Sequence, residues 1–263
     1  MVKIGDKTII QIYRGSELIT DDSSNTKDIK LGNKPVNFVY QGNELLYPNP
    51  VKDGLVLWYD FKSMKNSDFS KNVARDLSGK GNNGTLKNFN YTQLSGYDNG
   101  LKYDCIDDNL TVDTPTSIRT IEMTLKFSAN NTSDKILFHG NHLLDYFYIS
   151  PSSHFVFRNR KKSTGTFQLK SITNKTENDF SKIRHVTLVQ DNFKCAVYIN
   201  GNSNGVISNY TEEAIDFKLV NIFNYNNSKS LDDKLHSIKV YDRILTDEEI
   251  QHNYQLEKER WGL

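Results

Sequence analysis

Apolar residues alternate with other residues along most of the chain, and this spacing is that of β-strands. Residues 55–61 are the clearest case, because every odd-numbered position is apolar and the even-numbered positions turn polar at Asp60. Similar short segments recur throughout, separated by clusters of Gly, Asn, Asp and Ser that favour turns. The pattern predicts strands at 55–61, 84–89, 100–103, 109–112, 118–127, 135–139, 146–150, 154–158, 166–172, 184–190, 194–199, 206–207, 218–225 and 234–241.

Many short strands with almost no helix indicate an all-β sandwich or barrel. Their number exceeds that of an immunoglobulin-type domain, so a jelly roll of two large antiparallel sheets fits best. The strongest hairpin signal follows residues 194–199, where Asn200-Gly201 suits a type I′ turn. We expect a weaker return strand, because residues 202–205 lengthen the connection.

One short helix is predicted near the C-terminus. Thr246 occupies the N-cap position, and Glu249 three residues later completes a capping box. The helix is expected to carry a partial apolar face made of Ile250, Tyr254 and Leu256.

The sequence predicts a separate unit over residues 1–50, which contains an internal repeat. Residues 12–19 and 39–46 share the pattern aliphatic-Tyr-x-Gly-x-Glu-Leu-aliphatic, which predicts two hairpins joined by a polar loop over 20–33. Two such hairpins bury little apolar surface. The unit is therefore either an extension packed on the main domain, residues 51–263, or an attachment module completed by other chains. The residues expected to make assembly contacts are Tyr13, Gly15, Leu18, Tyr40, Gly42 and Leu45.

Composition narrows the classes of partner. The formal net charge is +1, so no global field attracts nucleic acid or an anionic membrane. No apolar stretch approaches the ~20 residues that span a bilayer. The first residues lack an apolar signal core, so standard export is not expected. Of the two cysteines, Cys105 and Cys195, the second lies in an apolar run, and we expect both to be reduced.

Candidate catalytic residues are sparse. A retaining glycoside hydrolase needs two carboxyl groups close together. The acidic run over 212–216 lacks a suitable spacing, and Glu122 stands alone in its strand. His139 and His142 are close in sequence, but no metalloprotease pattern surrounds them. A protein without enzymatic activity is expected, with a carbohydrate-active enzyme as the alternative.

The loop over 76–83 is the predicted cation site. Asp76, Ser78 and Asn82 offer hard oxygen ligands of the kind that calcium prefers. The alternative is a turn in which these side chains bond to nearby backbone groups. No cofactor is required, and calcium is the one that the loop would accept.

Glycan binding requires exposed aromatic rings with polar neighbours, because a sugar has an apolar face and a rim of hydroxyl groups. The alternative for each aromatic residue is a place in the core. The candidates are Tyr146, Tyr148, His154, Phe155, Tyr225, Asn226 and Asn227.

Four segments, 54–61, 76–84, 198–201 and 235–250, together resemble the laminin-G-like, concanavalin A-like jelly-roll domains of bacterial and phage proteins. The N-terminal repeat is similar to small modules of tailed-phage fibre and baseplate proteins. The resemblance implies a virion structural protein that displays a lectin-like sandwich to cell-surface polysaccharide. It also implies partners among virion proteins or copies of the chain, while the net charge argues against nucleic acid and membrane. A bacterial surface adhesin is a further alternative.

Overall fold

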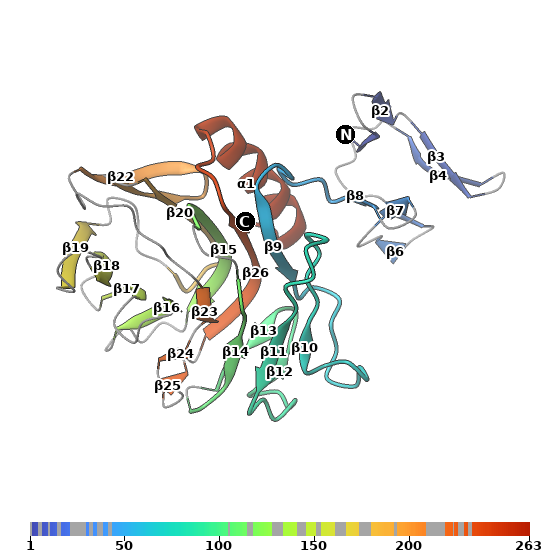
Figure 1. Ribbon diagram of the computed structural model, residues 1–263. Coiled ribbons are helices and arrows are strands. Elements are labelled where there is room, and N and C mark those ends of the chain that lie inside the picture. Colours follow the sequence, from blue (N-terminus) through green and yellow to red (C-terminus); the bar gives the residue numbers. More distant parts are fainter. Residues whose placement is uncertain are drawn as a thin grey trace.

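In a computed structural model, the described residues form a two-layer β-sandwich with one helix (Figure 1). The structure describes residues 48–104, 106–114, 118–127, 134–140, 146–150, 154–157, 180–191, 194–206 and 234–263 with their side chains, as well as Ile172, Ile222 and the backbone of the remaining strands. Cys105 and His142 lie outside the described residues. Among the described residues, no helix has the length and apolar character needed to cross a membrane.

One layer, the helix-side sheet, is antiparallel. Its strand order is β12 (Gly96–Tyr97), β13 (Leu101–Lys102), β26 (Asp233–Tyr241), β15 (Thr120–Phe127), β20 (Arg184–Gln190), β21 (Lys194–Ile199) and β22 (Asn202–Ser208), and β9 (Leu55–Asp60) also pairs with β26. Helix α1 (Asp247–Trp261) lies beside β9 and β26 in Figure 1.

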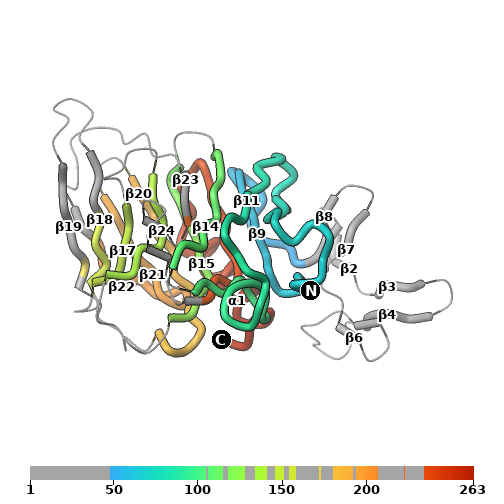
Figure 2. The backbone as a smooth tube through the Cα atoms, turned by 90° about the horizontal axis from the view of Figure 1, so that it is seen from below, coloured from blue at the N-terminus to red at the C-terminus, as the bar shows by residue number. Residues whose placement is uncertain are grey.

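The other layer, the far sheet, is also antiparallel. Its strand order is β10 (Val73–Ala74), β11 (Gly84–Lys87), β14 (Asn109–Thr111), β23 (Leu219–Ile222), β16 (Lys135–Gly140), β17 (Tyr146–Ile149), β18 (His154–Arg160) and β19 (Phe167–Thr173). Figure 2 shows the strands of both layers running side by side. The all-β fold with two large antiparallel sheets is therefore confirmed.

The main core lies between the two sheets. It is built from the alternate side chains that the sequence pattern marks as apolar, among them Leu57, Tyr59, Leu125, Phe147 and Ile238, none more than 1% exposed. A smaller apolar cluster, which includes Leu55, Trp58, Val189, Tyr241, Leu245 and Ile250, lies on the helix side. Burial on both faces explains why β9 is nearly continuous in apolar residues.

The predicted hairpin at Asn200-Gly201 is confirmed. Both residues have positive φ, 50° and 76°, as a type I′ turn requires. The expectation of a weak return strand is wrong, because β22 begins directly at Asn202 and absorbs the irregularity as a register shift opposite Val197 and Tyr198. The free thiol of Cys195 is buried in this hairpin.

The N-terminal repeat forms the two predicted hairpins. They are β3 (Gln11–Arg14) with β4 (Glu17–Asp21) and β7 (Val39–Gln41) with β8 (Glu44–Tyr47). Two further pairs, β1 (Val2–Ile4) with β2 (Lys7–Ile9) and β5 (Lys30–Leu31) with β6 (Lys34–Pro35), were not expected, and β5 falls in the segment predicted as loop. The side chains of Tyr13, Leu18, Tyr40 and Leu45, and the turn residues Gly15 and Gly42, lie outside the described residues. The boundary near residue 50 stays a prediction.

The helix begins where the capping box predicts. The Thr246 hydroxyl accepts a hydrogen bond from the backbone N–H of Glu249, and the Glu249 side chain accepts one from the backbone of Thr246. The expected apolar face is only partly correct. Ile250 is buried, whereas Tyr254 and Leu256 are half-buried, and the deeply buried positions of α1 include Asn253, Glu257 and Arg260. The helix therefore packs on the sheet through polar groups as well as through Ile250.

Candidate functional site

Two tyrosines of β17 stand on the outer face of the far sheet. Tyr146 and Tyr148 are half-buried, and they alternate with Phe147 and Ile149, which belong to the core. Their ring centroids are 5.5 Å apart, and the rings are inclined by 44°. We call Tyr146 and Tyr148 the tyrosine pair. The alternation of the strand thus places two aromatic rings next to each other at the surface.

The neighbouring strands place both apolar and polar side chains beside the tyrosine pair. In the sheet register, Tyr148 lies opposite Ile136 on one side and Val156 on the other. Val156 is only 4% exposed although it faces outward, so the rings lie beside covered apolar surface. His154 is half-buried and shares the outward face of β18 with Val156. Among the described residues, no helix covers this face of the far sheet.

Phe155 does not belong to this surface. The prediction that it contacts a glycan is wrong, and the geometry of the strand explains why. Its side chain is 0% exposed, and its ring stacks on Phe147 with centroids 5.8 Å apart. Successive residues of a strand face opposite sides, so His154 and Phe155 cannot share a surface. Tyr225 has only its backbone described, in β24 (Asn224–Tyr225), which pairs with β25 (Lys229–Ser230). Asn226 and Asn227 lie outside the described residues.

The tyrosine pair has the chemistry of a sugar platform. A tyrosine ring offers a flat apolar surface, and its hydroxyl group donates and accepts hydrogen bonds. His154 adds a polar ring on the neighbouring strand. Such a surface can stack on the apolar face of a sugar ring and form hydrogen bonds with its hydroxyl groups.

The Asp76 loop is organised by its carboxylate. One oxygen of Asp76 accepts hydrogen bonds from the backbone N–H groups of Trp58 (3.0 Å) and Ser78 (2.9 Å). The other accepts from the backbone N–H of Asn82 (2.9 Å) and from the Ser78 hydroxyl (2.8 Å). The Asn82 amide in turn donates to the carbonyl of Val56 at 2.7 Å. These contacts tie the loop to β9.

This geometry is a poor fit for calcium at Asp76, Ser78 and Asn82. Calcium binds roughly six to eight oxygen ligands. Each carboxylate oxygen of Asp76 already accepts two hydrogen bonds from the protein. A bound cation would have to displace backbone donors that hold the loop. The arrangement matches the turn in which these side chains bond to nearby backbone groups.

A second group of acidic residues was missed by the sequence reasoning. Carboxylate oxygens of Asp104, Asp107 and Asp108 lie within 4.8 Å of one another. Burial raises the pKa of Asp108 to about 6, although its carboxylate accepts hydrogen bonds from the Ser95 hydroxyl and the Asp104 backbone. Three carboxylates suit a hard cation better than the single carboxylate of the Asp76 loop. The closely spaced aspartates of residues 104–108 were the available signal.

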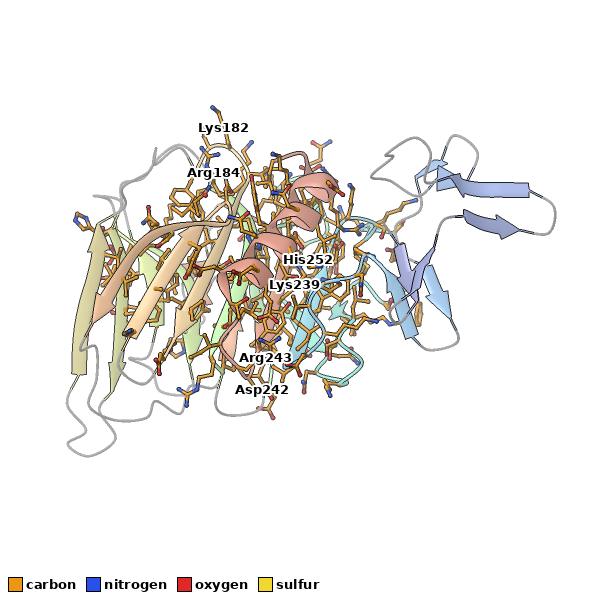
Figure 3. The ribbon with its side chains drawn as sticks, turned by 90° about the horizontal axis from the view of Figure 1, so that it is seen from above. Lys182, Arg184, Lys239, Asp242, Arg243 and His252 are labelled. Atoms are coloured by element: carbon orange, nitrogen blue, oxygen red, sulfur yellow. The ribbon has the colours of Figure 1, made fainter. Side chains whose placement is uncertain are left out.

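A buried polar network joins α1 to the helix-side sheet. The Glu257 carboxylate pairs with the ammonium group of Lys239 and accepts hydrogen bonds from the hydroxyls of Thr124 (2.7 Å) and Ser237 (2.6 Å). The Asn253 amide donates to Glu122 at 2.8 Å and to the Tyr241 hydroxyl at 2.9 Å. Figure 3 shows Lys239 close to the helix. The polar buried face of α1 thus meets matching polar groups of the sheet.

The two carboxyl groups of this network have pKa values on opposite sides of their usual range. Burial raises the pKa of Glu122 to about 8, an effect that Lys239 reduces and Glu257 reinforces. Burial also acts to raise the pKa of Glu257, but Lys239, His185 and Ser237 outweigh it and lower the value to about 2. Glu122 and Glu257 are 1% and 2% exposed. Glu122 is the one carboxyl group of β15, as expected, but Glu257 of α1 interacts with it electrostatically, and both groups are buried.

Two histidines of the helix-side sheet have lowered pKa values. Burial lowers the pKa of His185 to about 3, and burial followed by the charge of Lys234 lowers that of His236 to about 4. Both rings are therefore neutral at physiological pH. His139 is 4% exposed, and its expected neighbour His142 lies outside the described residues, so zinc binding there stays untested.

Comparisons with known proteins agree on the fold. The family described as the concanavalin A-like lectin/glucanases superfamily matches residues 98–251. A comparison with curated protein sequences finds no match.

Three solved structures have a similar sandwich. The binding domain of Paraclostridial mosquitocidal protein 1 has a TM-score of 0.54 and 16% identity, covering 77% of this chain and 52% of that one. The botulinum neurotoxin serotype D ligand binding domain in complex with N-acetylneuraminic acid has a TM-score of 0.57 and 13% identity, covering 78% and 51%. A Trypanosoma rangeli sialidase has a TM-score of 0.52 and 14% identity, covering 78% and 33%. The chain thus spans about half of either toxin domain and about a third of the sialidase.

Proposed function

This chain belongs to the concanavalin A-like lectin/glucanases superfamily, and on that premise we propose that it binds a glycan without catalysing a reaction on it. The observation that carries the proposal is the tyrosine pair, two adjacent rings on the outer face of the far sheet. The similar toxin domain in complex with N-acetylneuraminic acid supports it, because there a comparable sandwich is part of a sugar-binding protein. The ligand class is a surface polysaccharide or oligosaccharide.

The proposed absence of catalysis is supported by the buried carboxyl pair. Glycoside hydrolysis needs an acid and a nucleophile or base at the bond to be broken. Glu122 and Glu257 have contrasting pKa values, but both are buried between α1 and the helix-side sheet. A carbohydrate-active enzyme is the second candidate, because a sialidase is among the similar structures.

We further propose that the protein is a phage tail, fibre or baseplate component located in the virion. The N-terminal hairpins would attach it to other virion proteins or to copies of the chain. In support, the strands of residues 1–47 pair only within short two-stranded sheets among the described residues, and none joins the two large sheets. Small hairpins of this kind are marginal alone and gain stability from a partner surface.

A glycan array combined with an assay for released reducing sugar tests the proposed function. We expect the full chain to be retained by a defined set of glycans and to release no sugar from them. Turnover of any retained glycan would overturn the non-catalytic reading in favour of the enzyme. Failure to bind any glycan would remove the sugar-binding proposal itself.

A further inference from the structure

A small pocket lies at the edge of the sandwich where β9 ends and β10 begins. Its volume is about 250 Å³, and its apolar wall includes Phe61, Met64, Val73 and Leu77. This is below the ~300–1,000 Å³ typical of drug-sized sites, so a ligand of about one sugar ring fits. The pocket owes its shape to the chain leaving β9 at Phe61 and returning at Val73 to start the far sheet.

The charges at this pocket leave one cation uncompensated. Asp60 also lines it, but its carboxylate forms an ion pair with Arg260, whose Nη2 donates to Oδ1 at 2.9 Å. Their side chains are 1% and 7% exposed, so this pair is buried and neutral overall. Arg75, by contrast, is exposed and lines the pocket, and its guanidinium makes no hydrogen bond or ion pair with the part of the chain that the structure describes.

We propose that this pocket is a second sugar site, specific for a carboxylate-bearing monosaccharide. A guanidinium group binds a carboxylate through two parallel hydrogen bonds, which are stronger than hydrogen bonds between neutral groups. The apolar wall suits a non-polar substituent such as the methyl group of an N-acetyl group, and the exposed Ser63 hydroxyl lies at the same pocket. The inference rests on the proposed sugar-binding function.

The pocket is separate from the tyrosine pair. In the far sheet, β10 and β17 are five strand positions apart. Neighbouring strands are spaced by ~4.8 Å, which puts the two sites about 24 Å apart. A single monosaccharide therefore cannot occupy both, and each site can be disabled without the other.

The loop that joins the pocket-lining residues Met64 and Val73 adds a second contact. It carries Phe69, whose side chain is fully exposed. The loop is held by a hydrogen bond from the Lys65 backbone to the Asp68 carboxylate (2.8 Å) and by one from the Lys71 backbone to the Asp68 carbonyl (3.2 Å). An exposed ring on such a turn is available to stack on the sugar that follows the acidic one in a chain.

Calorimetric titration of the full chain with N-acetylneuraminic acid, and with its uncharged methyl ester, tests the inference. We expect the acid to bind at least about tenfold more tightly than the ester, because a hydrogen-bonded charge contributes more than a neutral contact. Arg75→Gln should weaken binding of the acid to a similar extent. Lys80→Gln, which removes an exposed cation from the neighbouring loop, and Tyr148→Ala should leave it unchanged.

Two further results decide between explanations. Ser63→Trp, which fills the pocket from its exposed rim, should also abolish binding of the acid, while the melting temperature checks that each variant is folded. Equal affinity of wild type and Arg75→Gln, or of acid and ester, overturns the pocket assignment. If neutral glycans still bind through the tyrosine pair while acidic sugars do not bind, this inference fails and the proposed function stands.

Discussion

The Glu122 carboxyl group makes the stability of the protein depend on pH. The substitution Glu122→Gln should remove this dependence. Glu122 is 1% exposed on β15, and burial raises its pKa to about 8. Its charged and titratable neighbours are Lys239 and Tyr241 on β26 and Glu257 on α1, and His185 on β20 interacts in turn with Lys239 and Glu257. The folded chain therefore keeps a proton on Glu122 at a pH where the unfolded chain has lost it.

The sign follows from linkage. A raised pKa in the folded state stabilises the folded protein. This stabilisation is complete below the pKa of the unfolded chain, near 4.5, and is lost as the pH rises through the folded pKa of about 8. Between these limits the contribution of Glu122 to the free energy of unfolding falls by about 1.4 kcal/mol per pH unit. His185 and His236 have lowered pKa values and act in the opposite direction, mainly below pH ~7, and wild type and a Glu122 variant share this effect. From pH 6.5 to 8, Glu122 alone should remove about 2 kcal/mol.

The assay is urea unfolding of wild type and Glu122→Gln at pH 6.5 and at pH 8. Glutamine keeps an acceptor for the Asn253 amide but carries no titrating proton, so the variant should lose little stability over this interval. At pH 8 it should be more stable than wild type. Glu248→Gln, an exposed substitution in the first turn of α1, is the matched control and should behave as wild type. Parallel losses of stability in wild type and Glu122→Gln would refute the reasoning.

Three more substitutions test the contacts that hold the fold. Glu257→Ala leaves the buried Lys239 without its counter-charge and should cost about 3–5 kcal/mol in chemical unfolding, with Glu257→Gln losing less. Asp76→Ala removes the acceptor of three backbone N–H groups and should lower the free energy of unfolding by about 3 kcal/mol, whether or not calcium is added. Thr246→Ala removes the N-cap of α1 and should cost about 1 kcal/mol, and Thr246→Asp should restore it.

Strand positions could be predicted from the sequence because burial on one face of a strand leaves a period of two. Residues 55–61, 184–190 and 194–199 were placed almost to the residue as β9, β20 and β21. The capping box likewise located the start of α1, since its residues are close together in the chain. Both signals are local, so no knowledge of the partner segments was needed.

The buried face of α1 could not be predicted, because its partners are far away in sequence. Asn253 bonds to Glu122, which precedes it by 131 residues, and Glu257 bonds to Thr124, which precedes it by 133. A polar residue on a helix normally indicates a solvated face. Here the outer face of the helix-side sheet carries Glu122, Thr124 and Lys239 beside its apolar cluster, so polar residues of α1 are buried as their partners.

The candidate site was predictable in part for the same reason. The alternation of Tyr146, Phe147 and Tyr148 places both tyrosines on one face of β17. Phe155 is aromatic and next to His154, so composition alone suggests a shared surface, but adjacent residues of a strand face opposite sides. The pocket beside Arg75 could not be predicted, because it forms where two strands of different sheets come together. The local sequence pattern does not indicate which strands are neighbours.

The affinity of one array-selected neutral glycan for wild type and for Tyr148→Ala tests the central claim most directly. Removing a stacked ring should weaken binding by about tenfold or more, while a cooperative thermal transition shows that the variant is folded. Tyr254→Ala on α1, a half-buried tyrosine on the other side of the sandwich, should bind as wild type does. Unchanged affinity in Tyr148→Ala, together with unchanged affinity in Tyr146→Ala, would contradict sugar binding on the far sheet.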